Sequence, residues 1–533
     1  MSYRAPLSDI SFMLANVVDY KNLSSTSLYE DASLETTSAI LNEAAKLAEE
    51  VLAPLQRVGD LSPAILENGV VRTSPGFSDG YKAIAQGGWI GVAANQKYGG
   101  MGLPLTIQTC VNEMMNGACL SLALNPLMSQ GQIDAIENHA NDTIRDLYLP
   151  KLISGEWSGT MNLTEPQAGS DVGALTSKAI NNGDGSYSIT GQKIYISWGD
   201  NDFTENVCHL VLARLPDSLP GTKGISLFIV PKFIPNSDGT LGIKNNLRVV
   251  SLEHKVGLHG SPTAVMEYDS AKGWLVGQES QGMKAMFTMM NNARLGVGAE
   301  GLGVAEAALQ KALKFASERK QGKSPTNQTG FIIDYADIRR KLLTMKSKTY
   351  AARAICLATA VAIDMSKATG EQKWITRAAL LTPMAKAFGT ETGMEISDLG
   401  IQIHGGMGFV EETGAAQYWR DVRVTSIYEG TNAIQAIDLV SRKLMDGGDA
   451  AFELINEIND LCANTPQSLN NLSNEVKLAV EALTNATKWM LSQDSLNSRL
   501  AGATPYLEAF SLVLGAFFHL KSAVADNGSG NYY

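Results

Sequence analysis

The chain has 533 residues, of which 44% are hydrophobic and 18% charged, so it can build two to four domains with large buried cores. Its formal net charge of −11 argues against a nucleic-acid-binding surface over the molecule as a whole. The five cysteines and six histidines are scattered, with no CxxC or zinc-like spacing. We therefore expect reduced thiols, a cytoplasmic protein and no metal site.

The sequence carries no evident secretory or membrane signal. The N-terminal stretch MSYRAPLSDISFML lacks a basic segment followed by an apolar one. The longest apolar run, AFSLVLGAFFHL at 509–520, is too short to span a bilayer and indicates a buried helix. We therefore expect no membrane span.

The hydrophobic pattern divides the chain into five stretches. Residues 1–36 are an N-terminal extension, and residues 37–158 are predicted to form a helical domain, because apolar residues recur three and four apart in TTSAILNEAAKLAEEVLAPL. Residues 159–278 alternate instead and contain β-branched runs such as SYSITGQKIYIS, CHLVLARL, GISLFIVPKF and TAVMEY, which predict a β-domain. Long helices are expected again over 279–446, at about 284–319, 334–366 and 373–399. Residues 447–533 are a further helical extension that ends in DNGSGNYY.

One motif in the fourth of these stretches, residues 279–446, points to helix packing. The segment GVGAEG, 296–301, is a literal GxGxxG pattern, but it has helical sequence on both sides. A dinucleotide-binding loop requires a strand before the glycines. We therefore interpret these small residues as sites where two helices approach closely.

Five further segments are each ambiguous alone: LTEPQAGSDVGA at 163–174, GQKIYIS at 191–197, ERKQGK at 318–323, QIHGGMGF at 402–409 and IYEGTNAIQ at 427–435. Each can be an ordinary turn, strand or helix end. Their order is far more specific. LTEPxxGSD, GQKxxIS, ERKxxGK, QIxGGxGF and IYEGTxxIQ together resemble the acyl-CoA dehydrogenase family of flavoproteins over about residues 40–445, and its larger bacterial branch that includes 3-(methylthio)propanoyl-CoA dehydrogenases.

The resemblance implies a fold that is mainly α with a central β-domain. An N-terminal helical domain, a middle β-barrel-like domain and a C-terminal four-helix bundle would be followed by the extra helical extension. It also implies that the protein binds FAD and that two subunits contact each FAD molecule. The residues that would line the flavin and its ribityl chain are Leu163, Thr164, Ser170, Tyr195, Ile196, Ser197 and Thr431, and those that would hold the pyrophosphate and adenosine are Arg319, Gln402, Gly405 and Gly406. A guanidinium and glycine amides suit a diphosphate.

Glu429 would be the base that removes the α-proton of an acyl-CoA thioester, while a hydride leaves the β-carbon for flavin N5. The residues expected near the substrate are Ser170, Arg294, Tyr428 and Gly430. Arg294 can equally be a buried arginine paired with a carboxylate, and Tyr428 can be a core residue. A helix that starts near Thr431 would stabilise the Glu429 anion by roughly 0.3–1 kcal/mol and so weaken it as a base. Desolvation by bound acyl-CoA would have to outweigh this effect.

The implied function is FAD-dependent dehydrogenation of an acyl-CoA to the 2-enoyl-CoA, on 3-(methylthio)propanoyl-CoA or another short acyl-CoA. Electron-transfer flavoprotein would be the acceptor, and a homodimer is favoured over a tetramer. Two alternatives stay open: an acyl-CoA oxidase on the same scaffold, and a DNA-binding relative. The second is disfavoured because residues 447–533 carry four basic side chains against nine acidic ones, a poor composition for contacting phosphates.

Overall fold

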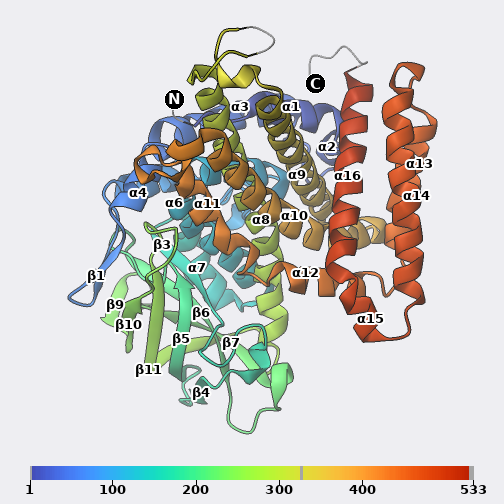
Figure 1. The fold of residues 1–533 in the computed structure, drawn as a ribbon. Coiled ribbons are helices and arrows are strands. Elements are labelled where there is room, and N and C mark those ends of the chain that lie inside the picture. Colours follow the sequence, from blue (N-terminus) through green and yellow to red (C-terminus); the bar gives the residue numbers. More distant parts are fainter. Residues whose placement is uncertain (1–2, 325–327, 527–533) are drawn as a thin grey trace. The chain divides into compact units, whose positions relative to one another are not determined.

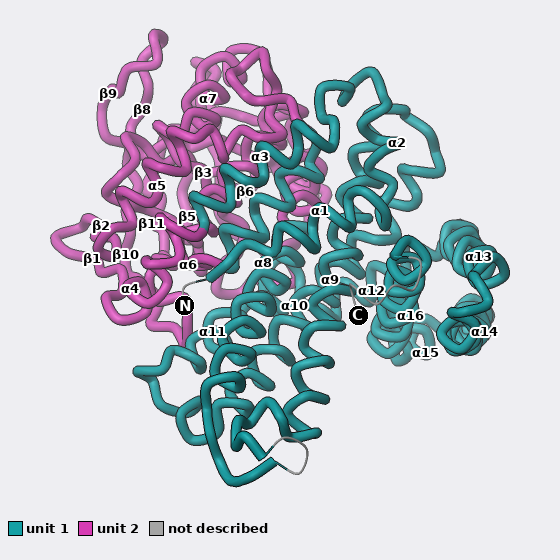
Figure 2. Tube along the Cα trace, turned by 90° about the horizontal axis from the view of Figure 1, so that it is seen from above, with its two compact units in different colours: residues 1–48, 104–117, 294–533 teal, residues 49–103, 118–293 magenta. Residues whose placement is uncertain are grey.

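The computed structural model describes residues 3–324 and 328–526, so most of the predicted polar tail lies outside the described residues (Figure 1). The chain forms two compact units (Figure 2). Unit 1 comprises residues 1–48, 104–117 and 294–533, and unit 2 comprises residues 49–103 and 118–293. Two long helices, α6 (Leu105–His139) and α8 (Gly282–Glu318), contribute residues to both units.

Unit 2 is built on a seven-stranded sheet whose strands are β3 (Trp157–Asn162), β4 (Lys178–Asn181), β5 (Tyr187–Ser197), β6 (Asn206–Arg214), β7 (Ile225–Pro231), β10 (Leu247–Leu252) and β11 (Thr263–Val276). Strand β11 pairs with β5, β5 with β4, β4 with β6, β6 with β7, and β7 again with β11. Five strands therefore close into a ring. Strand β10 adds to it by pairing with β11, and β3 adds to it by pairing with β6. The prediction of a barrel-like middle region is confirmed.

The interior of this ring is apolar because alternate residues of each strand point inward. Ile189, Val211, Phe228 and Met266 belong to its buried cluster. The other elements of unit 2 are α4 (Leu55–Leu61), β1 (Ile65–Glu67), β2 (Val70–Arg72), α5 (Phe77–Gln86), α7 (Asp142–Ser154), β8 (Phe233–Pro235) and β9 (Leu241–Lys244).

Unit 1 is helical. Its longest members are α8, α9 (Ala336–Thr369) and α10 (Gln372–His404), so the three long helices expected from the sequence are confirmed to within a few residues (Figure 1). The shorter helices that precede or follow them are α1 (Leu7–Asn16), α2 (Tyr20–Ser24), α3 (Leu34–Lys46), α11 (Ala415–Val422) and α12 (Asn432–Asp438).

Helices α8 and α10 approach each other backbone to backbone. A Cβ atom placed on Gly298 would lie 2.6 Å from the carbonyl oxygen of Ala385, and one placed on Gly389 would overlap the carbonyl of Gly298. Gly301 faces Gly389 in the same way. The GxGxxG segment therefore lies inside a helix and serves close packing, as the flanking sequence predicts.

The C-terminal extension consists of α13 (Asp449–Ala463), α14 (Asn470–Ser492), α15 (Leu496–Ala501) and α16 (Ala503–Ala525), and α16 packs against both α9 and α14. The buried helix expected at 509–520 is present, but it is longer than the apolar run, because it continues through less apolar residues at both ends. With 23 residues, α16 is the one described helix long and apolar enough to cross a membrane, which corrects the expectation that it is too short. Its most apolar stretch is 61% buried within the protein, as in the core helix of a folded domain.

The contact between α8 and α10 predicts a strong effect of one added methyl group. Gly389→Ala should lower the free energy of unfolding by about 1–3 kcal/mol, because the new methyl group must displace the Gly298 carbonyl. Urea unfolding of the purified protein measures this change. Gly400→Ala on the same helix is the control, since its methyl group would meet the Ala308 carbonyl oxygen at an ordinary 3.8 Å. Equal stability of the two variants would contradict the packing argument.

Candidate functional site

Glu429 lies in a strained turn immediately before α12. Glu429 and Gly430 have φ angles of 53° and 79°, a left-handed conformation that is unusual for a side chain as large as glutamate. The side-chain amide of Gln435 donates to the carbonyl oxygens of Glu429 at 3.3 Å and Gly430 at 3.1 Å and so holds the turn. Thr431 caps the helix by accepting a hydrogen bond from the Ile434 N–H at 3.2 Å. The predicted helix start at Thr431 is confirmed.

The carboxyl group of Glu429 is a stronger base than an ordinary glutamate. Burial raises its pKa to about 7, although the cations Lys386 and Arg294 lower it. Since α12 has only seven residues, the partial positive charge at its N-terminus is small and lowers the pKa of Glu429 only weakly. Glu429 is half-buried, so the protein itself supplies part of the desolvation that the sequence led us to expect from bound substrate.

Lys386, on α10, is fully buried and reaches this turn through an asparagine. Its ammonium donates to Asn432 Oδ1 at 2.9 Å, and Asn432 Nδ2 donates to Glu391 Oε1 at 2.6 Å. Burial lowers the pKa of Lys386 to about 8, although Glu300, Glu429 and Glu391 oppose that decrease. Lys386 is thus a cation close to the Glu429 carboxylate.

Arg294 has the carboxylate partner that one of its two sequence interpretations predicts. Its Nη1 atom lies 3.1 Å from Asp438 Oδ2, and both side chains are buried. Arg294 also lowers the pKa of Glu429 and therefore lies near the turn. The ion pair and proximity to the base are compatible roles.

The Tyr428 hydroxyl donates a hydrogen bond to Glu300 Oε2. Glu300 is fully buried on α8, and burial raises its pKa to about 8. Sequence reasoning missed both Glu300 and Lys386. A signal for Glu300 was available, because a carboxylate within the small-residue run GVGAEG must become buried once the glycines pack against another helix.

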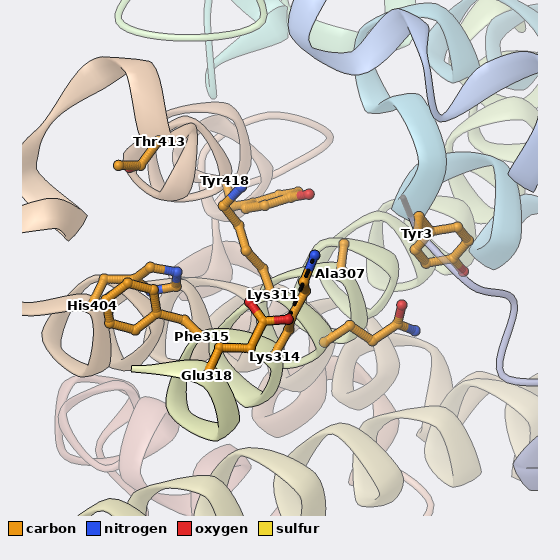
Figure 3. Close-up of a pocket in the computed structure, with 10 residues that line it drawn as sticks. Tyr3, Ala307, Lys311, Lys314, Phe315, Glu318, His404, Thr413 and Tyr418 are labelled. Atoms are coloured by element: carbon orange, nitrogen blue, oxygen red, sulfur yellow. Dashed lines mark ion pairs between the residues drawn. The ribbon is translucent and has the colours of Figure 1, made fainter. Parts of the chain in front are cut away.

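A second group of expected residues lies at the C-terminal ends of α8 and α10. Phe315 stacks on His404 with ring centroids 4.4 Å apart, which brings the two helix ends together. Both rings line a cavity of about 250 Å³ with Lys311, Lys314 and Glu318 (Figure 3). The expected cofactor residues are close to these side chains in sequence, and all are exposed: Arg319 follows Glu318, Gln402 lies two positions before His404, and Gly405 and Gly406 follow His404.

The two glycines of this group present open backbone. A Cβ atom on Gly405 or Gly406 would meet nothing within 4 Å, and Gly405 has a φ of 59°. A ligand can therefore approach the main chain here. Open glycine backbone and an exposed guanidinium suit a diphosphate.

A third group lies in unit 2, where the segment after β3 meets the end of β5. The Ile194 N–H donates to the Thr164 carbonyl at 2.9 Å, and Lys193 Nζ donates to the Leu163 carbonyl at 3.1 Å. Lys193 also forms a buried ion pair of 2.8 Å with Glu165. Burial lowers the pKa of Lys193 to about 8, whereas the lysine and neighbouring donors overcome the effect of burial and bring the pKa of Glu165 to about 2. This pair fixes the two segments together.

Tyr195 in this group is an unusual strand residue. It has a left-handed φ of 60°, and 62% of its surface is exposed, whereas the adjacent Ile196 is buried. Ser197 is half-buried and Ser170 is exposed. The end of β5 thus exposes an aromatic ring and carries a hydroxyl group beside it in sequence, chemistry that suits a flat heteroaromatic ligand.

The expected site residues thus fall into groups within the two units. Unit 2 holds Leu163, Thr164, Ser170, Tyr195, Ile196 and Ser197, and unit 1 holds Arg294, Arg319, Gln402, Gly405, Gly406, Tyr428, Glu429, Gly430 and Thr431. Within the two described ranges, no group of three or more His, Cys, Asp or Glu side chains is arranged to hold a metal ion.

Comparison with known proteins identifies the class. Models of the acyl-CoA dehydrogenase N-terminal, middle and C-terminal domains match residues 35–156, 160–271 and 280–445. A model described as acetyl-CoA dehydrogenase C-terminal like matches residues 454–530. The chain belongs to the acyl-CoA dehydrogenase family, and it is an oxidoreductase that acts on acyl-CoA.

Among its relatives is the 3-methylmercaptopropionyl-CoA dehydrogenase of Ruegeria pomeroyi, which is 43% identical over 85% of this chain and 78% of its own length. A butyryl-CoA dehydrogenase of Syntrophomonas wolfei is 34% identical over 87% of this chain and 80% of its own. The solved structure of ACDH-11 from Caenorhabditis elegans, only 18% identical, has the same fold with a TM-score of 0.82, covering 100% of this chain and 90% of that one. The likeness extends through the C-terminal extension.

The electrostatics of the turn predict how Glu429 responds to loss of Lys386. Lys386→Gln removes a nearby cation that favours the ionised carboxylate, so the titration midpoint of Glu429 should rise from about pH 7 by about one pH unit. NMR of protein labelled with ¹³C at the glutamate carboxyl carbon measures the midpoint, with Glu429→Gln assigning the signal. Lys348→Gln is the control, because Lys348 pairs with the exposed Glu395. A midpoint unchanged in Lys386→Gln would be contrary to this account.

Proposed function

We propose that this protein uses FAD to convert an acyl-CoA into its 2-enoyl-CoA, with Glu429 as the base for the α-proton. The observation that carries the proposal is the Glu429 carboxyl group, held by a strained turn and buried enough to raise its pKa to about 7. The α-proton of a thioester is only weakly acidic, and a base with a pKa near the working pH combines ionisation with proton affinity.

The chain contributes orientation and charge to this step. Gln435 fixes the backbone on which Glu429 stands, and Arg294 and Lys386 keep part of its charge compensated. A thioester carbonyl would be polarised by the backbone N–H of Glu429, which lowers the cost of removing the neighbouring proton. Tyr428, Gly430, Arg294 and Ser170 are proposed to contact the substrate.

FAD fits the groups described above. Leu163, Thr164, Ser170, Tyr195, Ile196, Ser197 and Thr431 would hold the flavin and its ribityl chain, and Arg319, Gln402, Gly405 and Gly406 would hold the pyrophosphate and adenosine. The open backbone at Gly405 and Gly406 and the exposed ring of Tyr195 support this assignment. Bound FAD would accept the hydride from the β-carbon.

The substrate is proposed to be short, with 3-(methylthio)propanoyl-CoA as the first candidate. This rests on the 43% identical relative, whose name specifies that acyl group, and on the butyryl-CoA dehydrogenase relative. Electron-transfer flavoprotein is the proposed acceptor. We further propose a cytoplasmic homodimer, a location with which five free cysteines agree.

The division at residues 36, 158, 278 and 446 is likewise proposed as the domain organisation. The ranges of the family models, 35–156, 160–271, 280–445 and 454–530, support it.

Replacing the base tests the central claim. Glu429→Gln should retain FAD but slow flavin bleaching by acyl-CoA by about 10²-fold or more, because the amide cannot take the α-proton. Anaerobic stopped-flow mixing with a panel of short acyl-CoAs measures the bleaching, and Glu395→Gln, an exposed glutamate, is the control. Bleaching at the normal rate in Glu429→Gln would refute the assignment. Rapid oxygen consumption by the wild-type enzyme would favour the oxidase alternative.

The pH dependence follows from the raised pKa of Glu429. Only the ionised carboxylate accepts a proton, so flavin reduction should fall as pH decreases through about 7, well above the ordinary range of a glutamate. Stopped-flow reduction rates at saturating acyl-CoA from pH 5.5 to 9 give the midpoint. A midpoint near 4.5 would mean that the turn does not strengthen the base.

A further inference from the structure

A buried acid and a buried base lie in the contact between α8 and α10, and the proposed function does not use the acid. Glu300 stands between Gly298 and Gly301, and Lys386 follows Ala385, whose carbonyl faces Gly298. Both side chains are fully buried. The close approach of the two helices thus places a carboxyl group within the electrostatic range of an ammonium in a dry environment.

Tyr428 connects this acid to the turn that carries the base. It immediately precedes Glu429, and its hydroxyl donates to Glu300 Oε2. The other oxygen of Glu300, Oε1, is buried without a hydrogen-bond partner among the residues described. An unpaired buried oxygen is costly for a carboxylate anion and less costly for the neutral acid.

The charges around the turn do not balance when every acid is ionised. The groups that interact electrostatically here are Arg294 and Glu300 from α8, Lys386 and Glu391 from α10, and Tyr428 and Glu429 from the turn. Arg294 is paired with Asp438 of α12, and Glu391 is exposed. The fully buried Glu300 and the half-buried Glu429 therefore share one lysine, and such a pair of carboxyl groups retains a proton.

We propose that Glu300 is a positioning residue for Glu429: held by Tyr428 and sharing Lys386 with the base, it carries the single proton of the carboxyl pair near neutral pH. This rests on Glu429 being the base. Glu300 holds the proton because it is more deeply buried, which leaves Glu429 as the anion that can accept the α-proton. Burial, which raises the pKa of Glu300 to about 8 and that of Glu429 to about 7, agrees with this order.

The protonation state of Glu300 gives Glu429 two different proton affinities. Below about pH 8, Glu429 ionises beside a neutral Glu300. At higher pH, Glu300 also ionises, and the second negative charge increases the proton affinity of Glu429. Wild-type flavin reduction should therefore rise in two steps with pH.

Glu300→Gln tests this directly, because glutamine resembles the protonated acid and still accepts a hydrogen bond from Tyr428. Flavin reduction at pH 7 should stay within about twofold of wild type, whereas at pH 9.5 it should be about three- to tenfold slower, because the second step is lost. Glu395→Gln should keep both steps. Identical pH profiles in wild type and Glu300→Gln, or an equal loss at every pH, would overturn the proposal.

Tyr428→Phe adds a signed test. The Tyr428 hydroxyl lowers the pKa of Glu300, so its removal should move the midpoint of the second step to higher pH at saturating acyl-CoA. Loss of the substrate contact proposed for Tyr428 would lower the rate at every pH and would not move this midpoint. An unmoved second step counts against the proposal.

A spectroscopic titration separates this inference from the proposed reaction. Infrared difference spectra of the purified flavoprotein should show the C=O stretch of a buried protonated carboxyl group at pH 7, absent in Glu300→Gln. Suppose that this band is present in the wild type and absent in Glu300→Gln, but acyl-CoA does not bleach the flavin. The proposed reaction is then wrong, and the proposal that Glu300 holds the proton is supported. If the band is missing, the shared proton is wrong whatever the reaction.

Discussion

The approach of α8 to α10 through glycines is the constraint on which the rest of unit 1 depends. Carbonyl groups of one helix occupy the space that a Cβ atom would need on the other, so the two backbones have one position relative to each other. That position places Glu300 and Lys386 in the same dry region and brings the helix ends together at Phe315 and His404. Small residues here determine the electrostatics as well as the packing.

Near this contact, the protein raises the pKa of a carboxyl group, that of Glu429, against effects that lower it. The end of a helix stabilises an anion, and two cations near Glu429 act in the same direction. Burial opposes both and prevails, because desolvation of a charge in a packed interior exceeds the effect of a seven-residue helix. The left-handed backbone at Glu429, secured by Gln435, holds the carboxyl group in this environment.

Unit 2 holds its own group of expected residues in a different way. The closed ring of strands gives a rigid frame, and the buried Lys193–Glu165 pair joins the segment after β3 to β5. Removing one partner of such a pair would leave an uncompensated buried charge, so the two are tightly linked in stability. Tyr195 lies in β5, and its ring is exposed and not part of the buried core.

The sequence by itself determined the order of helices and strands, the helical nature of the GxGxxG segment, the family, and the turn at Glu429, because each depends on local periodicity, glycine positions or an ordered series of motifs. It did not determine which strands close the ring, here β7 and β11, or the full length of α16, since pairing between distant strands and helix extension depend on tertiary packing. Nor did it show Glu300 beside Lys386, which are 86 positions apart in the chain. Which charges share a dry interior is decided only when the helices pack, because desolvation depends on the surrounding protein and not on sequence neighbours.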